Sequence, residues 1–133
     1  SQPGIARSIP KSRAEIMQEL SAEKVGFLSR SEVMQQTRLY KTLNEIRSSD
    51  LQGLRNSLVR ARIPLQEFDE GLHKLVGLEA SGLRIAKMAD GRCVFTEDNL
   101  ADVLQRNPRL LGEVRFVHDK VLAPINNLIA SKK

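Results

Sequence analysis

The 133-residue sequence has little of what several common functional classes require. It has no tryptophan and one tyrosine, Tyr40, beside four phenylalanines, so it lacks a set of rings on which single-stranded bases could stack. Its only cysteine, Cys93, excludes an internal disulfide and a multi-thiolate metal site. No apolar run approaches the roughly 18 residues that cross a bilayer, and the N-terminal stretch has no apolar centre typical of a signal peptide. We therefore expect no membrane partner and a cytoplasmic or otherwise intracellular location.

Residues that could support catalysis or metal binding are also sparse. His73 and His118 are the only histidines, and they fall in separate predicted helices, with Cys93 on a predicted strand between them. No spacing places two such ligands on one element, and Cys93 lacks an activating base and is predicted to lie in the core. Three closely spaced acids belong to one predicted helix and point in different directions, which favours a solvated face: Glu67, Asp69 and Glu70. The sequence predicts no catalytic residue, no metal, no cofactor and no enzyme.

The overall composition is that of an ordinary folded protein with an excess of positive charge. Apolar residues make up 41% and charged residues 28%, and Lys and Arg total 21 against 16 Asp and Glu, for a net charge of +5. This charge makes polyanions candidate partners. Residues 1–11 contain two prolines and a glycine without apolar periodicity, which predicts a mobile basic arm. Residues 12–133 are predicted to form a single domain.

The first half of this domain reads as a series of helices. An S-x-x-E capping box at Ser12 predicts a short first helix, and a second box at Ser29 opens a longer apolar period that continues to Ile46. The next helix is predicted to run from Leu51 to about Arg62. Pro64 then starts a fourth helix, whose apolar face is expected to contain Leu65, Phe68, Leu72, Leu75 and Val76.

The second half predicts a hairpin followed by C-terminal helices over residues 96–131. Two short extended runs surround the turn signal Asp90–Gly91, which is typical of a β-hairpin. Thr96 is expected to begin a helix that Asn107–Pro108 stops, and a last long helix is expected to be bent or broken at Pro124. The expected fold is mainly α, a helical domain with a small antiparallel β-hairpin. Its predicted core contains Val33, Tyr40, Leu43, Ile46, Leu54, Leu58, Phe68, Leu72, Leu75, Ile85, Val94, Leu100 and Leu104.

The order helix, helix, helix, hairpin over residues 33–95 resembles the winged-helix variant of the helix-turn-helix superfamily. The segments that carry the resemblance are LYKTLNEI, LQGLRNSLVRA, PLQEFDEGLHKLVGLE and GLRIAKMADGRCVFT. The resemblance is one of layout and apolar spacing, covers about half of the chain and identifies no particular family. It implies a winged-helix-like centre between N- and C-terminal helices, whose third helix enters the major groove of DNA while the hairpin wing touches the backbone or the minor groove.

The charges modify this expectation. The outward face of the third helix carries three acids against one fixed cation, and each close acid would oppose a phosphate by roughly 1 kcal/mol in water. The basic residues instead lie before this helix and in the hairpin, where guanidinium groups could grip phosphates. The predicted nucleic-acid-binding residues are Arg55, Arg60, Arg62, Arg84, Lys87 and Arg92. The leading hypothesis is thus a non-enzymatic duplex-DNA-binding module of a regulator or DNA-processing assembly.

Two other functions remain open at this point. The scaffold could be a protein-interaction adaptor that docks a partner through the acidic third helix or the long C-terminal helix. It could also be an assembly subunit that packs its N-terminal helices and residues 109–130 against other subunits, or against copies of itself. A contiguous basic edge would favour DNA, whereas dispersed cations beside a large apolar patch would favour protein assembly.

Overall fold

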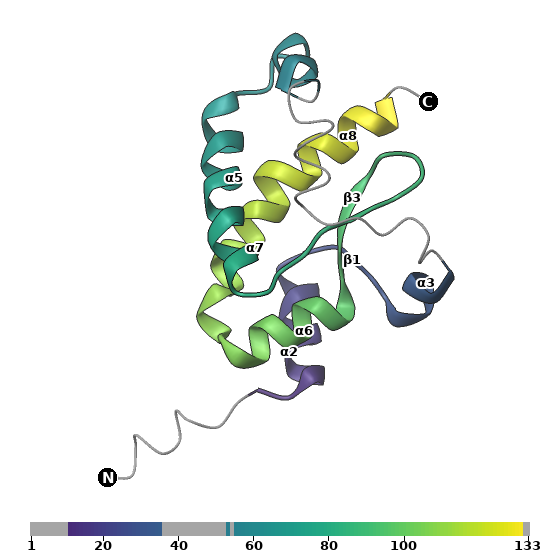
Figure 1. Ribbon diagram of the computed structural model, residues 1–133, viewed down its shortest axis with the longest axis vertical. Helices are drawn as coiled ribbons and strands as arrows, with labels where there is room; N and C mark the ends of the chain where they lie inside the picture. Colours follow the sequence, from purple (N-terminus) through teal and green to yellow (C-terminus); the bar gives the residue numbers. More distant parts are fainter. Residues whose placement is uncertain (1–10, 36–52, 54, 132–133) are drawn as a thin grey trace.

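The computed structural model describes residues 11–35, 53 and 55–131, and it is mainly helical with one small three-stranded sheet (Figure 1). This confirms the predicted fold class. In chain order the elements are α2 (Arg13–Ala22), β1 (Phe27–Leu28), α3 (Arg30–Gln35), α5 (Leu65–Ala80), β2 (Ala86–Lys87), β3 (Cys93–Thr96), α6 (Glu97–Arg106), the 3-10 turn η2 (Pro108–Leu110), α7 (Leu111–Val117), the π-helical η3 (His118–Leu122) and α8 (Ala123–Ser131). Residues 55–60 are also helical and precede α5.

Both predicted capping boxes are present at the starts of α2 and α3. In the first, Ser12 N–H donates to the Glu15 carboxylate at 2.9 Å and Glu15 N–H donates to Ser12 Oγ at 3.2 Å. In the second, Ser29 N–H donates to Glu32 at 2.8 Å and receives the reciprocal bond through its Oγ at 3.3 Å. These bonds satisfy N–H groups that a helix start would otherwise leave without partners. The predicted continuation of the second helix lies outside the described residues, as do Tyr40, Leu43, Ile46 and Leu54 of the predicted core.

Three helices end in the same way, with a residue of positive φ followed by an apolar residue that bonds back into the helix. The φ angles are 60° at Lys24, 61° at Arg62 and 104° at Gly82. The N–H of the next residue donates to a leucine carbonyl five positions earlier, in the pairs Val25 to Leu20, Ile63 to Leu58 and Leu83 to Leu78. This is the Schellman arrangement, in which a left-handed residue redirects the chain and the apolar pair closes over the helix end. The predicted helix end near Arg62 is confirmed.

The predicted hairpin is confirmed, and a third strand extends it. β2 and β3 pair antiparallel, with Ala86 opposite Val94, and the reversal contains Gly91 at a φ of 96°. β1 adds to the other side of β3 in parallel, with Phe27 opposite Phe95, so the strand order is β1-β3-β2. Because β1 has only two residues, it shows no period of alternating polarity from which a strand could be predicted.

Of the C-terminal helices, α7 and η3 pack against the buried face of α5. α6 begins after Thr96 and ends before Asn107–Pro108 as predicted. The last helix departs from regular α geometry over η3, which ends two residues before Pro124, a residue that has no N–H to donate to the preceding turn. η3 lies close to α5, because a Cβ atom on Gly71 would collide with Val121. Glycine at this position therefore permits the close approach of the two helices.

The core lies between α5, the C-terminal helices, α2 and the sheet. The predicted core residues Leu58, Phe68, Leu75, Ile85, Leu100 and Leu104 are buried, whereas Val33, Leu72 and Val94 are half-buried. Cys93 is buried as predicted. The placement of Val76 on the apolar face was wrong, since 46% of it is exposed. The buried face of α5 advances in steps of three and four from Phe68 through Gly71 and Leu75 to Leu78, and Val76 lies about 100° further round the helix.

Candidate nucleic-acid interface

The five arginines among the six cations predicted to bind DNA fall into three environments. The first contains Arg60 and Arg62, at the end of the helix that precedes α5. Both side chains are exposed, and no carboxylate of the described residues pairs with either of them. Arg60 is 3.3 Å from the hydroxyl of Ser57, which leaves most of its guanidinium donors to solvent. These two arginines are thus the most available of the six cations.

A second group consists of arginines that pair with an acid. Arg55, on the same helix, forms an ion pair with Asp69 of α5. Arg92 in the hairpin donates through Nε to Asp90 at 2.8 Å, and its backbone N–H donates to the same carboxylate at 3.1 Å. Lys87 is half-buried on β2, opposite Cys93. A phosphate would have to compete with Asp69 or Asp90 for these guanidinium groups.

Arg84 has a structural environment of its own. Its Nη1 donates to the carbonyl of Glu79 at 2.9 Å and to the carbonyl of Leu83 at 2.7 Å. Both acceptors lie at or just beyond the end of α5, where helix carbonyls lack partners within the helix and attract a positive charge. The arrangement of Arg84 is that of a cap on α5.

The structure does not bring all six cations to one end of α5. Arg55, Arg60 and Arg62 precede its first residue, and Arg84 follows its last. A helix of 16 residues is about 24 Å long. Figure 1 shows residues 55–60 at one end of α5 and the connection to β2 at the other. Arg60 and Arg62 therefore lie at the opposite end of α5 from Arg84.

The acids of α5 face solvent, as the sequence predicted. Glu67, Asp69 and Glu70 are all exposed. Glu67 pairs with Lys120 of η3 at 3.3 Å, and Asp69 pairs with Arg55. The opposite face of the helix is buried against α7 and η3. Glu70 has no ion-pair partner among the described residues, so the outward face of α5 retains one unpaired acid that would repel a phosphate.

Two asparagines that the sequence reasoning missed hold the hairpin in place. Asn99 of α6 accepts from Arg84 N–H at 2.6 Å and donates to the carbonyl of Gly82 at 3.0 Å. Asn126 of α8 accepts from Cys93 N–H at 2.8 Å and donates to the carbonyl of the same residue at 2.9 Å. Each side-chain amide thus bonds a loop or strand backbone as a neighbouring strand would. No spacing in the sequence indicates these contacts, because their partners are remote in the chain.

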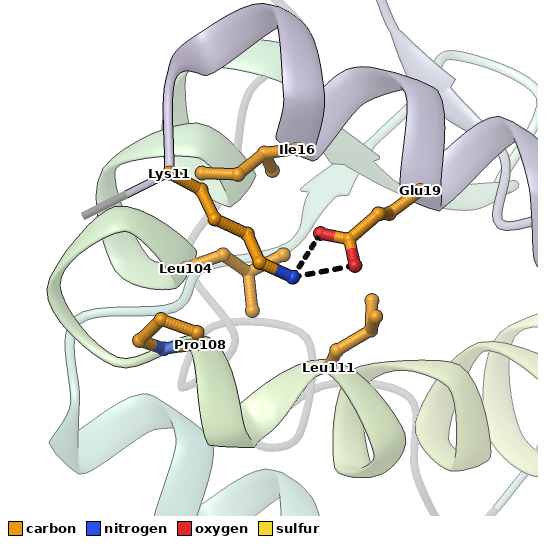
Figure 2. Close-up of a pocket in the computed structure, with 6 residues that line it drawn as sticks. All are labelled: Lys11, Ile16, Glu19, Leu104, Pro108 and Leu111. Atoms are coloured by element: carbon orange, nitrogen blue, oxygen red, sulfur yellow. Dashed lines mark hydrogen bonds and ion pairs between the residues drawn. The ribbon is translucent and has the colours of Figure 1, made fainter. Parts of the chain in front are cut away.

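A small hollow lies where the chain enters α2 (Figure 2). Its apolar walls are Ile16, Leu104, Pro108 and Leu111, and Lys11 bonds Glu19 across its mouth at 2.6 Å. The space is about 10 Å³, which is room for roughly one water molecule. This volume is far below the several hundred Å³ of a small-molecule site. The hollow also shows that Lys11, at the end of the predicted arm, contacts the folded domain.

No group of three or more His, Cys, Asp and Glu side chains in the described part of the chain is arranged to hold a metal ion. Over the same residues, every helix is too short or too polar to cross a membrane. The chain matches no protein-family model, no curated protein and no solved structure.

Proposed function

We propose that this protein is a non-enzymatic module that binds the sugar-phosphate backbone of duplex DNA, with Arg60 and Arg62 as its principal contacts. One observation carries the proposal. These two arginines are exposed, lie two positions apart at a helix end, and have no carboxylate partner among the described residues. Guanidinium groups in such a setting bind phosphate oxygens through paired hydrogen bonds, and the net charge of +5 adds long-range attraction.

The other predicted cations contribute less in this proposal. Lys87 and Arg92 belong to the hairpin, which corresponds to the wing of the resemblance, and Arg92 must leave Asp90 before it can bind a phosphate. Arg55 must likewise leave Asp69. Arg84 contributes least because it caps α5. We thus expect binding strength to depend on Arg60 and Arg62 first, on the hairpin second and on Arg84 least.

The conformation of Arg62 allows a sharp test. A non-glycine residue at positive φ costs about 1–2 kcal/mol, so Arg62→Gly removes a cation while relieving backbone strain. Lys24→Gly is a matched control, because Lys24 has the same φ, occupies the same position in a Schellman motif, is exposed and carries the same charge. Lys24 lies at the end of α2, away from the proposed surface.

The experiment measures the affinity of the two glycine variants and of Arg60→Ala for duplex DNA over a series of salt concentrations. We expect Arg62→Gly and Arg60→Ala each to weaken binding several-fold at low salt. Each should also reduce the slope of log K against log salt by about 0.9, the value for one phosphate contact. Lys24→Gly should bind like the wild type. Equal losses from Lys24→Gly and Arg62→Gly would mean that net charge alone attracts DNA, and absence of wild-type binding at low salt would refute the proposal.

A second function, a protein-interaction adaptor, is favoured by the outward face of α5. Glu70 there has no ion-pair partner among the described residues, and Val76, almost two turns later on the same helix, is 46% exposed. Such a face suits a partner with a basic and apolar surface. Glu70→Gln separates the two functions, because it should leave DNA binding equal or slightly stronger. If it abolishes capture of a protein partner while Arg60→Ala has no effect on any binding, the adaptor is the better description.

A further inference from the structure

The side chain of His118 connects the C-terminal helices to the start of β1. Its Nε2 accepts a hydrogen bond from the backbone N–H of Gly26 at 3.0 Å. Its Nδ1 lies 3.0 Å from Oδ1 of Asp119. Gly26 directly precedes β1, the two-residue strand at the edge of the sheet, and His118 begins η3. The contact thus joins two segments that are remote in sequence.

These two bonds require one protonation state. A backbone N–H can only donate, so Nε2 of His118 must carry a lone pair. The proton of the neutral ring is then on Nδ1, where it is donated to the carboxylate of Asp119. If Nε2 took up a proton, two donors would face each other, and the bond to Gly26 would be lost. The side chain is 20% exposed, so protons can reach it from solvent.

The charged groups around the ring come from three directions. On its own element, Asp119 accepts from Nδ1 and would stabilise an imidazolium. Arg115 of α7 lies 4.0 Å from Asp119 and donates to Glu23, the residue after α2, at 2.7 Å. Lys24 follows Glu23 and is exposed. On the side of η3 toward α5, Lys120 pairs with Glu67. The negative charge of Asp119 would let the released ring remain protonated beside it.

We propose that His118 is an acid-sensitive latch that fastens the start of β1 to the C-terminal helices through Gly26. The latched form cannot hold a proton on Nε2, whereas the released form can. Because the released form binds more protons, the latch weakens as the pH falls. The proposal does not depend on whether the protein binds DNA.

The test follows His118 and the Gly26 amide by NMR in the full chain. At pH 7.5 the ¹⁵N signals of His118 should show a proton on Nδ1 and none on Nε2. Between pH 7.5 and 5.0, exchange of the Gly26 amide, corrected for its intrinsic rate, should become about tenfold less protected, the effect of one lost hydrogen bond. His73 is exposed and provides an internal reference for an imidazole outside the latch.

Three variants separate the latch from a general effect of acid. His118→Gln supplies a carbonyl oxygen that can accept from Gly26 but does not titrate, so the pH step in Gly26 protection should disappear. His73→Gln should retain the step. Asp119→Asn keeps an acceptor for the Nδ1 proton, so the proton on Nδ1 and the bond from Gly26 should both persist at pH 7.5. A proton on Nε2 at pH 7.5, or an unchanged step in His118→Gln, would overturn the proposal, and the first result needs no variant to fold.

Discussion

The hairpin region and the basic segment, residues 55–62, both contain arginines, but the arginines differ in how far they bond to other groups of the protein. In the hairpin region Arg84 donates to two backbone carbonyls, Arg92 pairs with Asp90, and Asn99 and Asn126 hold the backbone from two different helices. In the basic segment Arg60 and Arg62 extend into solvent, and Arg62 adopts a backbone conformation that glycine favours.

This difference shows that the role of an arginine depends on the acceptors the fold brings to it. In the hairpin region, the carbonyl of Glu79 near the end of α5 accepts from the side chain of Arg84, and the carboxylate of Asp90 in the turn accepts from the side chain of Arg92. No such acceptor reaches Arg60 or Arg62 among the described residues. Substitutions in the hairpin should therefore mainly lower the free energy of unfolding, whereas substitutions of Arg60 and Arg62 should mainly lower the affinity for DNA.

The largest effect is expected for Asn126→Ala. The substitution removes the partner that Asn126 provides to both the N–H and the carbonyl of Cys93, a residue that is 2% exposed. Since each of the two hydrogen bonds contributes about 0.5–1.5 kcal/mol, we expect a loss of about 1–3 kcal/mol. Asn127→Ala is the matched control, because Asn127 is exposed on the same helix. Chemical denaturation of both variants measures the difference, and equal stabilities would show that the hairpin is not held by Asn126.

A smaller effect is expected when the two classes of arginine are compared directly. Arg84→Ala removes one hydrogen bond to the carbonyl of Glu79, near the end of α5, and one to the carbonyl of Leu83, and it should lower the free energy of unfolding by about 1–2 kcal/mol. Arg60→Ala should change it by less than about 0.5 kcal/mol, because the side chain is exposed. The reverse order is expected for DNA affinity. Loss of stability in Arg60→Ala similar to that in Arg84→Ala would remove the contrast between the two regions.

The third prediction concerns the strained helix ends. Arg62→Gly and Lys24→Gly relieve a positive φ but lose the attraction of a cation to the helix C-terminus and gain chain entropy in the unfolded state. The net result should be a stabilisation of about 0.5 kcal/mol in each case. The midpoint temperature of thermal unfolding, Tm, should rise by roughly 2 °C in each variant. Destabilisation of both variants would show that the basic side chains contribute more to the helix ends than the backbone strain costs.

Much of the fold could be predicted because its signals are local. The capping boxes at Ser12 and Ser29, the start of α5 after Pro64 and the turn at Asp90–Gly91 each act within a few residues, and the structure confirms all four. The apolar periods of three and four residues likewise identified Phe68 and Leu75 of α5 and Leu100 and Leu104 of α6 as buried, but they missed Leu78 and wrongly included Val76.

The parts that could not be predicted depend on contacts between remote segments. The pairing of β1 with β3, the asparagine bonds to the hairpin and the bond from Gly26 to His118 join residues far apart in the chain. Spacing carries no information about such partners. The candidate site shows the same limit, since the sequence gives six cations but not which carboxylate or carbonyl engages each of them.

The smallest effect is expected at the two capping boxes. They use the same hydrogen bonds, but one starts a helix that packs into the core and the other starts a helix that buries no residue. Hydrogen bonds from the Ser12 backbone and side chain hold the pKa of Glu15 below its ordinary value, and those from Ser29 do the same for Glu32. A carboxyl whose pKa is lowered by folding stabilises the protein above its ordinary pKa, and this contribution is lost as the pH falls through the folded-state pKa.

The two capping boxes should differ in whether this loss of stability at low pH affects the whole domain or only the helix that the box starts. α2 buries Ile16 and Leu20, so weakening its start should affect unfolding of the whole domain, whereas α3 buries no residue and should fray alone. Glutamine retains a capping bond without titrating, so Glu15→Gln should slightly reduce the acid dependence of global stability between pH 7 and pH 3, and Glu32→Gln should not. Denaturation curves at the two pH values measure the first effect, and amide exchange in α3 measures the second. An equal change in global stability from both variants would mean that α3 is coupled to the core as firmly as α2.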